Sequence, residues 1–436
     1  MKLLNTVARS GPALLLRAAD FRLVWLGEAV SQIGDGLNRV ALLWFVYQTQ
    51  HSALKTSVVG VLQTLPPLLL GPLFGVYLDR VAKKRVLIVV SLVHGALVAL
   101  LPLLFSLGLL TLFRLYALVF VTSVVATFYG PALTLVVPLV VPNHELRAAN
   151  ALIQSTSTIG VLLGPVVAGV AISAFGAVNV LYLDAATFLF SVGCIWFVPV
   201  RESRPIVKGR LGVSQLLQNL QDGIRFMLRK QTGILLLTLV TCLENFGASA
   251  FIFLLPALAK QNVSAHSLSI GGFWTAFGTG MFLATLVVAS LRDDPKRGLL
   301  WFLPAALGLG GAAVAALTRA RGWLAPAVLM IVVGFATASL APVVITLLEE
   351  STPEGLRGRV LSTFNAANMA MAMVGMLVFG WAADHVGETP TLIAVGIVMA
   401  SAGVVLAAIS WTASTRRLVM RPYGPENGRA SEPRQP

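Results

Sequence analysis

The sequence predicts an all-α integral membrane protein with twelve transmembrane helices, arranged as two pseudo-symmetric six-helix bundles. Three observations support this prediction: the composition, the recurrence of long apolar runs, and an internal repeat. Hydrophobic residues make up 57% of the chain and charged residues only 11%, whereas about 25% of the residues of a soluble domain are charged. Polar residues are too scarce to cover a soluble globule of this size, so the surplus apolar surface is expected to face lipid.

Apolar runs of transmembrane length recur along the whole chain. A helix needs about 20 residues, at about 1.5 Å per residue, to cross about 30 Å of hydrocarbon. The twelve runs are expected near residues 22–48, 57–79, 85–109, 112–140, 149–173, 178–200, 233–259, 270–291, 298–318, 324–348, 360–383 and 388–412.

The basic residues indicate the orientation, because cytoplasmic loops of membrane proteins are rich in Lys and Arg. One of the 32 Lys and Arg residues, Arg39, lies inside a span, and most of the others fall in the segments on the side of the two termini. The alternate loops carry only Lys55, Arg114, Lys260, Arg319 and Arg321. Both termini are therefore predicted to be cytoplasmic. The net charge of +14 then reflects membrane topology and does not indicate nucleic-acid binding.

The longest connection divides the chain into six spans and six spans. Its centre, residues 215–230, predicts an amphipathic helix that lies at the lipid headgroups. Its apolar positions at helical spacing are Leu216, Leu217, Leu220, Ile224 and Leu228. The expected organisation is a cytoplasmic N-terminal segment (1–21), a six-helix bundle (22–200), a cytoplasmic linker (201–231), a second six-helix bundle (232–412) and a disordered cytoplasmic tail (413–436).

The two halves are related by a repeat with an offset of 211 residues. The residue pairs at this offset are Pro131 and Pro342, Pro142 and Pro353, and Gly176 and Gly387. The basic turn Lys84-Arg85 also recurs, at an offset of 212, as Lys296-Arg297. Several matches at one spacing indicate duplication. Duplicated halves that enclose a central site are typical of secondary transporters, which rock around that site.

The turn after the second span carries an acid followed by a basic cluster. The run from Gly71 to Arg85 resembles the signature between helices two and three of the major facilitator superfamily, although Ala82 stands where that family usually has glycine. The resemblance implies the major facilitator fold, and it implies a gating role in which an aspartate and its cationic neighbours hold the two halves together on the inside. Those residues are Asp79, Arg80, Lys83, Lys84 and Arg85. Ordinary positive-inside topology would explain the basic residues but would not explain Asp79.

The fifth span contains a glycine- and proline-rich motif. It resembles the antiporter signature of exporters in the same superfamily, and it predicts a kinked helix with a flat face for close packing. The motif residues are Gly160, Gly164, Pro165 and Gly169. Such patches also occur in unrelated membrane helices. Together with the preceding turn, this motif favours efflux over uptake.

Ionisable residues inside spans are candidates for ion coupling, because each costs at least about 2.5 kcal/mol near mid-bilayer. Glu28, Gln32, Asp35 and Arg39 are spaced by four, three and four residues, which places them on one stripe of the first helix. Glu28, Asp35, Arg39 and, in the seventh span, Glu244 are the predicted coupling or ion-binding residues. Alternatively, Asp35 and Arg39 pair and neutralise each other. Asp184, near the external end of the sixth span, is expected to be a structural contact.

Polar and flexible side chains in other spans are candidates for a substrate cavity. Methionine lines adaptable pockets for greasy ligands, although ordinary helix packing would also explain its presence. The candidate residues are Gln32, Asn245, Asn365, Asn368, Met369 and Met373.

The first span also resembles one branch of the superfamily, through the run from Ser31 to Gly36 and the preceding Asp20-Phe21-Arg22. That branch comprises siderophore exporters and macrolide or multidrug efflux proteins. The resemblance implies a monomeric multi-pass exporter in a bacterial inner membrane, which moves a lipophilic or amphipathic molecule in exchange for protons or another cation. The fourth span departs from many proton-coupled exporters, because its arginine, Arg114, is at the outer end and not in mid-span.

Other classes of function are less well supported. An ATP-driven pump needs a phosphate-binding loop of the type Gly-x4-Gly-Lys-[Ser/Thr], which the sequence lacks. No constellation of catalytic side chains indicates an enzyme, and no cofactor or metal is expected. The remaining alternatives are a lysophospholipid transporter of the same fold, because the fourth and fifth spans also resemble those proteins, and a non-transporting membrane scaffold.

Overall fold

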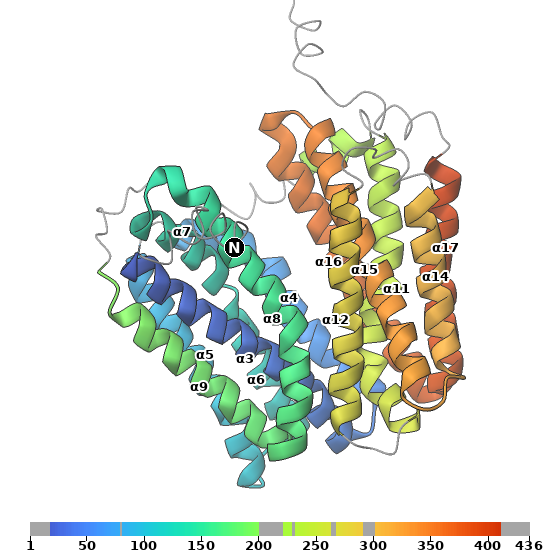
Figure 1. The fold of residues 1–436 in the computed structure, drawn as a ribbon, viewed down its shortest axis with the longest axis horizontal. Helices are drawn as coiled ribbons and strands as arrows, with labels where there is room; N and C mark the ends of the chain where they lie inside the picture. Colours follow the sequence, from blue (N-terminus) through green and yellow to red (C-terminus); the bar gives the residue numbers. More distant parts are fainter. Residues whose placement is uncertain are drawn as a thin grey trace, which may run out of the picture. The chain divides into compact units, whose positions relative to one another are not determined.

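The computed structural model describes residues 18–78, 81–199, 221–228, 232–262, 267–290 and 301–410, and within these ranges the secondary structure is helical throughout (Figure 1). The first half contains α3 (Ala19–Gln50), α4 (Ala53–Leu78), α5 (Lys83–Ser106), α6 (Leu112–Ala126), α7 (Tyr129–Val140), α8 (Leu146–Phe175) and α9 (Ala177–Trp196). The second half contains α11 (Thr232–Asn262), α12 (Ser267–Ser290), α14 (Leu303–Leu317), α15 (Leu324–Ser351), α16 (Glu354–His385) and α17 (Glu388–Ser410). The prediction of an all-α protein is confirmed.

Among the described residues, helix covers the twelve expected apolar runs apart from a few residues at run ends and a break at residues 127–128 in the fourth run. Nine helical segments among the described residues are long and apolar enough to cross a membrane. α3 is not among these nine, because Glu28, Asp35 and Arg39 reduce its hydropathy. α14 falls short on length, with 15 residues, and α8 (Leu146–Phe175) is not among the nine either.

The fourth expected span, residues 112–140, corresponds to one apolar span, Leu112–Val140, in which the helix is interrupted. α6 ends at Ala126, Phe128 N–H bonds to the Val125 carbonyl, and α7 begins at Tyr129. Pro131 explains the interruption, because it has no N–H to donate to the carbonyl of Thr127.

Contacts divide the chain into two units, the first of which comprises Met1–His51, Val58–Gly212 and Ser264–Thr275. Within unit 1, α3 packs along α8 and α9, and α5 packs along α9 (Figure 1). The contact between α3 and α8 is very close, because a Cβ atom added at Gly164 would lie 2.6 Å from the Cα of Gly36. An apolar core of α3, α5, α7 and α9 residues includes Phe21, Leu87, Val136 and Ile195.

The second unit comprises Ser52–Ser57, Val213–Val263 and Ala276–Pro436. Within it, α11 packs along α16 and α17, and α14 packs along α15 and α17. The carboxylate of Asp384 on α16 accepts hydrogen bonds from the backbone N–H groups of Ala53 (2.7 Å) and Leu54 (3.3 Å), and from the hydroxyl of Ser52. An acid at this position satisfies the free N–H groups of the first turn of α4.

The linker forms a helix at residues 221–228, as its pattern predicted for this part. Ile224 and Leu228 of the predicted apolar row are exposed, whereas Phe226 and Met227 are buried in the core of unit 2. An ion pair of 2.7 Å between Asp222 and Arg359 holds the helix against α16. Residues 201–220 and 229–231 of the linker, and the tail beyond residue 410, lie outside the described ranges.

Candidate substrate and coupling site

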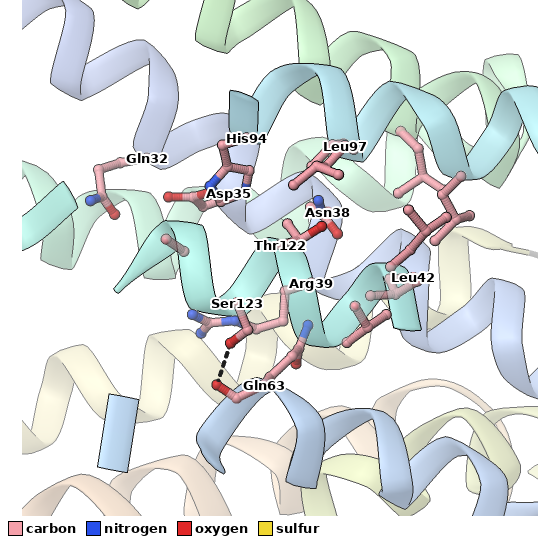
Figure 2. Close-up of a pocket in the computed structure, with 16 residues that line it drawn as sticks. Gln32, Asp35, Asn38, Arg39, Leu42, Gln63, His94, Leu97, Thr122 and Ser123 are labelled. Atoms are coloured by element: carbon pink, nitrogen blue, oxygen red, sulfur yellow. Dashed lines mark hydrogen bonds between the residues drawn. The ribbon is translucent and has the colours of Figure 1, made fainter. Parts of the chain in front are cut away.

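A cavity of about 310 Å³ lies within unit 1, among α3, α4, α5, α6 and α9 (Figure 2). Part of its wall is apolar and is formed mainly by leucine and valine side chains of α3, α5, α6 and α9. The rest of the wall is polar and consists of Gln32, Asp35, Asn38, Arg39, Gln63, His94, Thr122 and Ser123. A cavity of this size and mixed character can hold a small amphipathic molecule.

Glu28 lies at the centre of a hydrogen-bond network beside this cavity. Its side chain is 3% exposed. It accepts one hydrogen bond from Gln32 Nε2 (2.7 Å) and one from the Tyr129 hydroxyl (2.7 Å). The amide oxygen of Gln32 in turn accepts a 3.5 Å hydrogen bond from Ser157 of α8. The network therefore gives a buried carboxylate neutral donors from its own helix and from α7.

Asp35 and Arg39 line the same cavity without forming an ion pair there. The charge of Asp35 interacts with those of Glu28 and Arg39, but among the described residues no direct salt bridge joins Asp35 to Arg39. Arg39 is exposed and extends into the cavity, as Figure 2 shows. The structure therefore does not contain the direct ion pair between these two residues that the alternative required.

Asp184 on α9 lies against the same stretch of α3. It is fully buried, and its Oδ2 atom accepts a 2.6 Å hydrogen bond from Asn38. Its Oδ1 atom accepts no hydrogen bond from the described residues. A Cβ atom added at Gly34 would lie 2.5 Å from Oδ1, so this carboxylate lies between Gly34 and Asn38, and its charge interacts with that of Asp35.

Several lining residues were not anticipated from the sequence. Asn38 lies three residues after Asp35 on the stripe that sequence spacing had already identified. His94 stacks on Phe188 of α9, with ring centroids 4.3 Å apart. A lone histidine inside an apolar span could have been found by the rule applied to the carboxylates, namely that ionisable residues in spans tend to be functional. Ser123 donates a 2.7 Å hydrogen bond to the Gln63 carbonyl and so joins α6 to α4 (Figure 2).

Glu244 lies in unit 2, on α11. It is 3% exposed, and its Oε1 atom has no hydrogen-bond partner among the residues that the structure describes. One turn further along α11, Gly247 faces Val395 and Met399 of α17. Glu244 is thus a buried acid on a helix that packs closely against an apolar neighbour.

Of the expected substrate-cavity residues in unit 2, Asn245 and Asn368 lie together, joined by a 3.0 Å hydrogen bond from Asn245 Nδ2 to Asn368 Oδ1. Asn365 is exposed, and Met369 and Met373 are half-buried. Their role in a substrate cavity stays a prediction.

Two of the predicted gating residues, Asp79 and Arg80, lie outside the described ranges. Lys83 begins α5, and Arg85 is exposed in its first turn. Lys84 donates hydrogen bonds of 2.8 and 2.7 Å to the carbonyls of Trp196 and Val198 at the end of α9. A cation at this position stabilises the C-terminus of α9.

The glycine motif of the fifth span lies on α8, which is one continuous helix through Gly160, Gly164, Pro165 and Gly169. Gly160 and Gly164 pack directly against α3, and a Cβ atom added at Gly160 would lie 2.8 Å from the Cβ of Gln32. Gly169 is buried, whereas the side chain of Pro165 lies outside the described part of the chain. The motif therefore provides a flat face where α3 and α8 meet. The kink stays a prediction.

Residues 10–419 match the family of transmembrane secretion effectors, within the major facilitator superfamily. The chain belongs to this family. The resemblance found in the sequence is thereby confirmed, and this transmembrane secretion effector is a multi-pass membrane transporter and not an enzyme.

Two efflux proteins are related over most of their length. Macrolide efflux protein A of Streptococcus pyogenes is 24% identical over 370 residues, which cover 84% of this chain and 90% of the relative. Multidrug efflux pump Tap of Mycolicibacterium fortuitum is 24% identical over 412 residues, which cover 92% of this chain and 96% of the relative.

Solved transporter structures have the same fold. A bacterial homologue of the human lysosomal transporter Spinster, in an inward-facing unoccupied conformation, aligns with a TM-score of 0.73 at 11% identity, over 96% of this chain and 99% of that one. The nucleoside transporter NupG aligns with a TM-score of 0.72 at 14% identity, over 90% and 99%. At such low identity, these likenesses concern the fold alone.

Proposed function

We propose that this transmembrane secretion effector is a secondary active exporter that moves a lipophilic or amphipathic small molecule, such as a drug, macrolide or siderophore-like compound, out of a bacterial cell in exchange for protons. It has twelve spans in two six-helix bundles and both termini in the cytoplasm, as the distribution of basic residues supports. The macrolide and multidrug efflux proteins to which it is related support this direction of transport.

The cavity in unit 1 is the observation on which this proposal mainly rests. It combines an apolar wall with a carboxylate, Asp35, and a cation, Arg39. An amphipathic cation can place its apolar body against the leucine and valine side chains and its charge beside Asp35. This combination favours ligands that share an apolar body and one charged group over small polar metabolites.

Proton coupling is proposed on the balance of charges around this cavity. Glu28, Asp35 and Asp184 are three acids, and Arg39 is the one permanent cation among the described residues that line the cavity. Unpaired charges are costly in a medium of low dielectric constant. The binding of a proton at one acid offsets that cost, and so does the binding of a cationic substrate. Proton and substrate therefore compete for the same negative charge, which is the condition for exchange.

Asp184 and Tyr129 have supporting roles in this scheme. Asp184 places a second carboxylate beside the stretch of α3 that carries Asp35, because it lies against Gly34 and Asn38. Tyr129 donates a hydrogen bond to Glu28 through its hydroxyl. A hydrogen bond to a charged group contributes about 1.5–3 kcal/mol, so we expect Tyr129→Phe to reduce coupled transport about tenfold or more.

The test uses the full chain reconstituted in vesicles, with a fluorescent lipophilic cation and a macrolide as substrates and an imposed pH gradient. We expect movement of substrate against its gradient, and its loss in Glu28→Gln and Asp35→Asn. Asp184→Asn keeps an oxygen for the Asn38 hydrogen bond but removes the charge, so it should also weaken the response to the pH gradient.

Glu350→Gln is the matched control, because Glu350 is an exposed carboxylate on α15, and it should transport like the wild type. Full gradient-driven transport by both Glu28→Gln and Asp35→Asn would refute the coupling proposal. Substrate movement that is indifferent to the pH gradient in the wild type would refute proton exchange. Movement of a labelled lysophospholipid in place of both substrates would indicate a lipid transporter.

A further inference from the structure

A second, larger cavity of about 540 Å³ lies on unit 1, between α5 and the junction of α6 and α7. Of its nine described lining residues, eight are apolar, and Arg85 is charged. Val89 and Val93 are 50% and 41% exposed, so this cavity is an open groove on the outer surface of the helices. On a membrane protein such a surface faces lipid.

The groove exists because of two local features of the sequence. The helix break at Thr127 and Phe128 ends α6, and Phe128 forms one side of the groove. On the other side, α5 presents Val86, Val89 and Val93, whose short β-branched side chains leave space that longer ones would fill.

The length of the groove matches one leaflet of a bilayer. Arg85 and Val93 are eight residues apart on α5, which corresponds to about 12 Å along the helix. Half of the hydrocarbon core is about 15 Å thick. In the proposed topology Arg85 lies at the cytoplasmic surface, so the apolar part of the groove extends from the headgroups nearly to the bilayer centre.

We propose that this groove binds one anionic phospholipid of the cytoplasmic leaflet, with an acyl chain along the valines and the phosphate at Arg85. A guanidinium suits this role because it is planar and can donate two parallel hydrogen bonds to a phosphate. Neighbouring Lys84 is directed elsewhere, to the carbonyls of Trp196 and Val198. The site is separate from the cavity that contains Asp35, so it does not depend on the proposed transport chemistry.

Unit 2 contains a cavity that can be compared with the groove of unit 1. A smaller cavity of about 340 Å³ lies between α14 and α15, and its described lining, which includes Phe302, Ala305 and Phe335, is wholly apolar. Phe302 and Ala305 correspond to Val90 and Val93 at the 212-residue offset of the basic turns. At the same offset Arg85 corresponds to Arg297, which lies outside the described residues. The two cavities can therefore be compared only in their apolar linings, and the lipid site in unit 1 rests on the position of Arg85 in its lining.

The test is native mass spectrometry of the purified full chain, after delipidation and addition of either phosphatidylglycerol or phosphatidylcholine. We expect the wild type to retain one phosphatidylglycerol and about tenfold less phosphatidylcholine. Both lipids have a phosphate, but the choline cation makes phosphatidylcholine net neutral and repels Arg85. Glycerophosphoglycerol, which has the headgroup but no acyl chains, should not be retained.

Four variants separate the contributions of the headgroup and the chain. Arg85→Gln should lose the preference for phosphatidylglycerol, and Arg85→Lys should keep part of it. Val89→Trp fills the groove and should reduce retention of both lipids, whereas Val404→Trp, at an exposed position of α17, should leave retention of phosphatidylglycerol unchanged. Equal retention of the two lipids by the wild type would overturn the proposal. So would unchanged retention of phosphatidylglycerol in Arg85→Gln and Val89→Trp, each confirmed as folded by its melting temperature.

Discussion

The close contact between α3 and α8 allows a sharp test of the packing around the proposed coupling residues. A Cβ atom added at Gly164 would lie 2.6 Å from the Cα of Gly36, whereas ordinary van der Waals contact begins at 3.4 Å. In Gly164→Ala the two helices must therefore separate locally by about 0.8 Å. A change of side-chain rotamer cannot relieve this overlap, because the Cα of Gly36 is a backbone atom.

Overpacking of this kind costs about 1–3 kcal/mol. For a folding unit of about 200 residues, 1 kcal/mol lowers the melting temperature by about 2–4 °C, so we expect Gly164→Ala to melt about 2–12 °C below the wild type. Cys194 and Cys242 are free and buried. A thiol-reactive fluorophore therefore reports unfolding in detergent without any added label.

Gly193→Ala is the matched control, because Gly193 is also helical and a Cβ atom there would meet nothing within 4 Å. It should melt at or slightly above the wild-type temperature, since alanine favours helix over glycine by about 0.5–1 kcal/mol. Gly36→Ala meets the same contact from the other side, so the double variant with Gly164→Ala should lose less stability than the sum of the single losses. Equal melting of Gly164→Ala and Gly193→Ala would refute the close packing of α3 and α8.

Two further predictions concern charged groups. Lys84→Ala should lower the free energy of unfolding by about 1–3 kcal/mol, because two carbonyls at the end of α9 lose a charged donor. Lys83→Ala should change it by less than about 0.5 kcal/mol, and equal melting of the two variants would show that Lys84 does not hold α9. Glu244→Met should raise the melting temperature, since a buried acid with an unpartnered oxygen becomes apolar, and the same variant should lose coupled transport. A lower melting temperature would mean that Glu244 has a stabilising partner.

Helix positions could be predicted well from the sequence, because the bilayer requires apolar runs of nearly fixed length. The run at residues 324–348 corresponds to α15 at Leu324–Ser351, and that at residues 178–200 corresponds to α9 at Ala177–Trp196. The break in the fourth span was missed, because hydropathy depends on side chains, whereas the break follows from the missing N–H of Pro131.

The candidate site was only partly predictable, because helical periodicity relates residues of one helix and not those of different helices. The stripe from Glu28 to Arg39 followed from spacing alone. Tyr129 and Asp184 contact that stripe from α7 and α9, and no spacing within one helix could indicate this. Asp184 was expected to be a structural contact, and its unpartnered oxygen beside Gly34 is visible only in three dimensions.

The glycine motif and the acids are connected physically through Gln32. One side of this residue packs on Gly160, where the absence of a side chain lets α8 approach. The amide nitrogen of Gln32 donates to Glu28, and its amide oxygen accepts from Ser157 of α8. A shift of α8 along α3 would therefore change the hydrogen bonds that Gln32 makes, and with them the number of donors that Glu28 receives. In this arrangement small residues at the interface link helix packing to the hydrogen bonds of a buried acid.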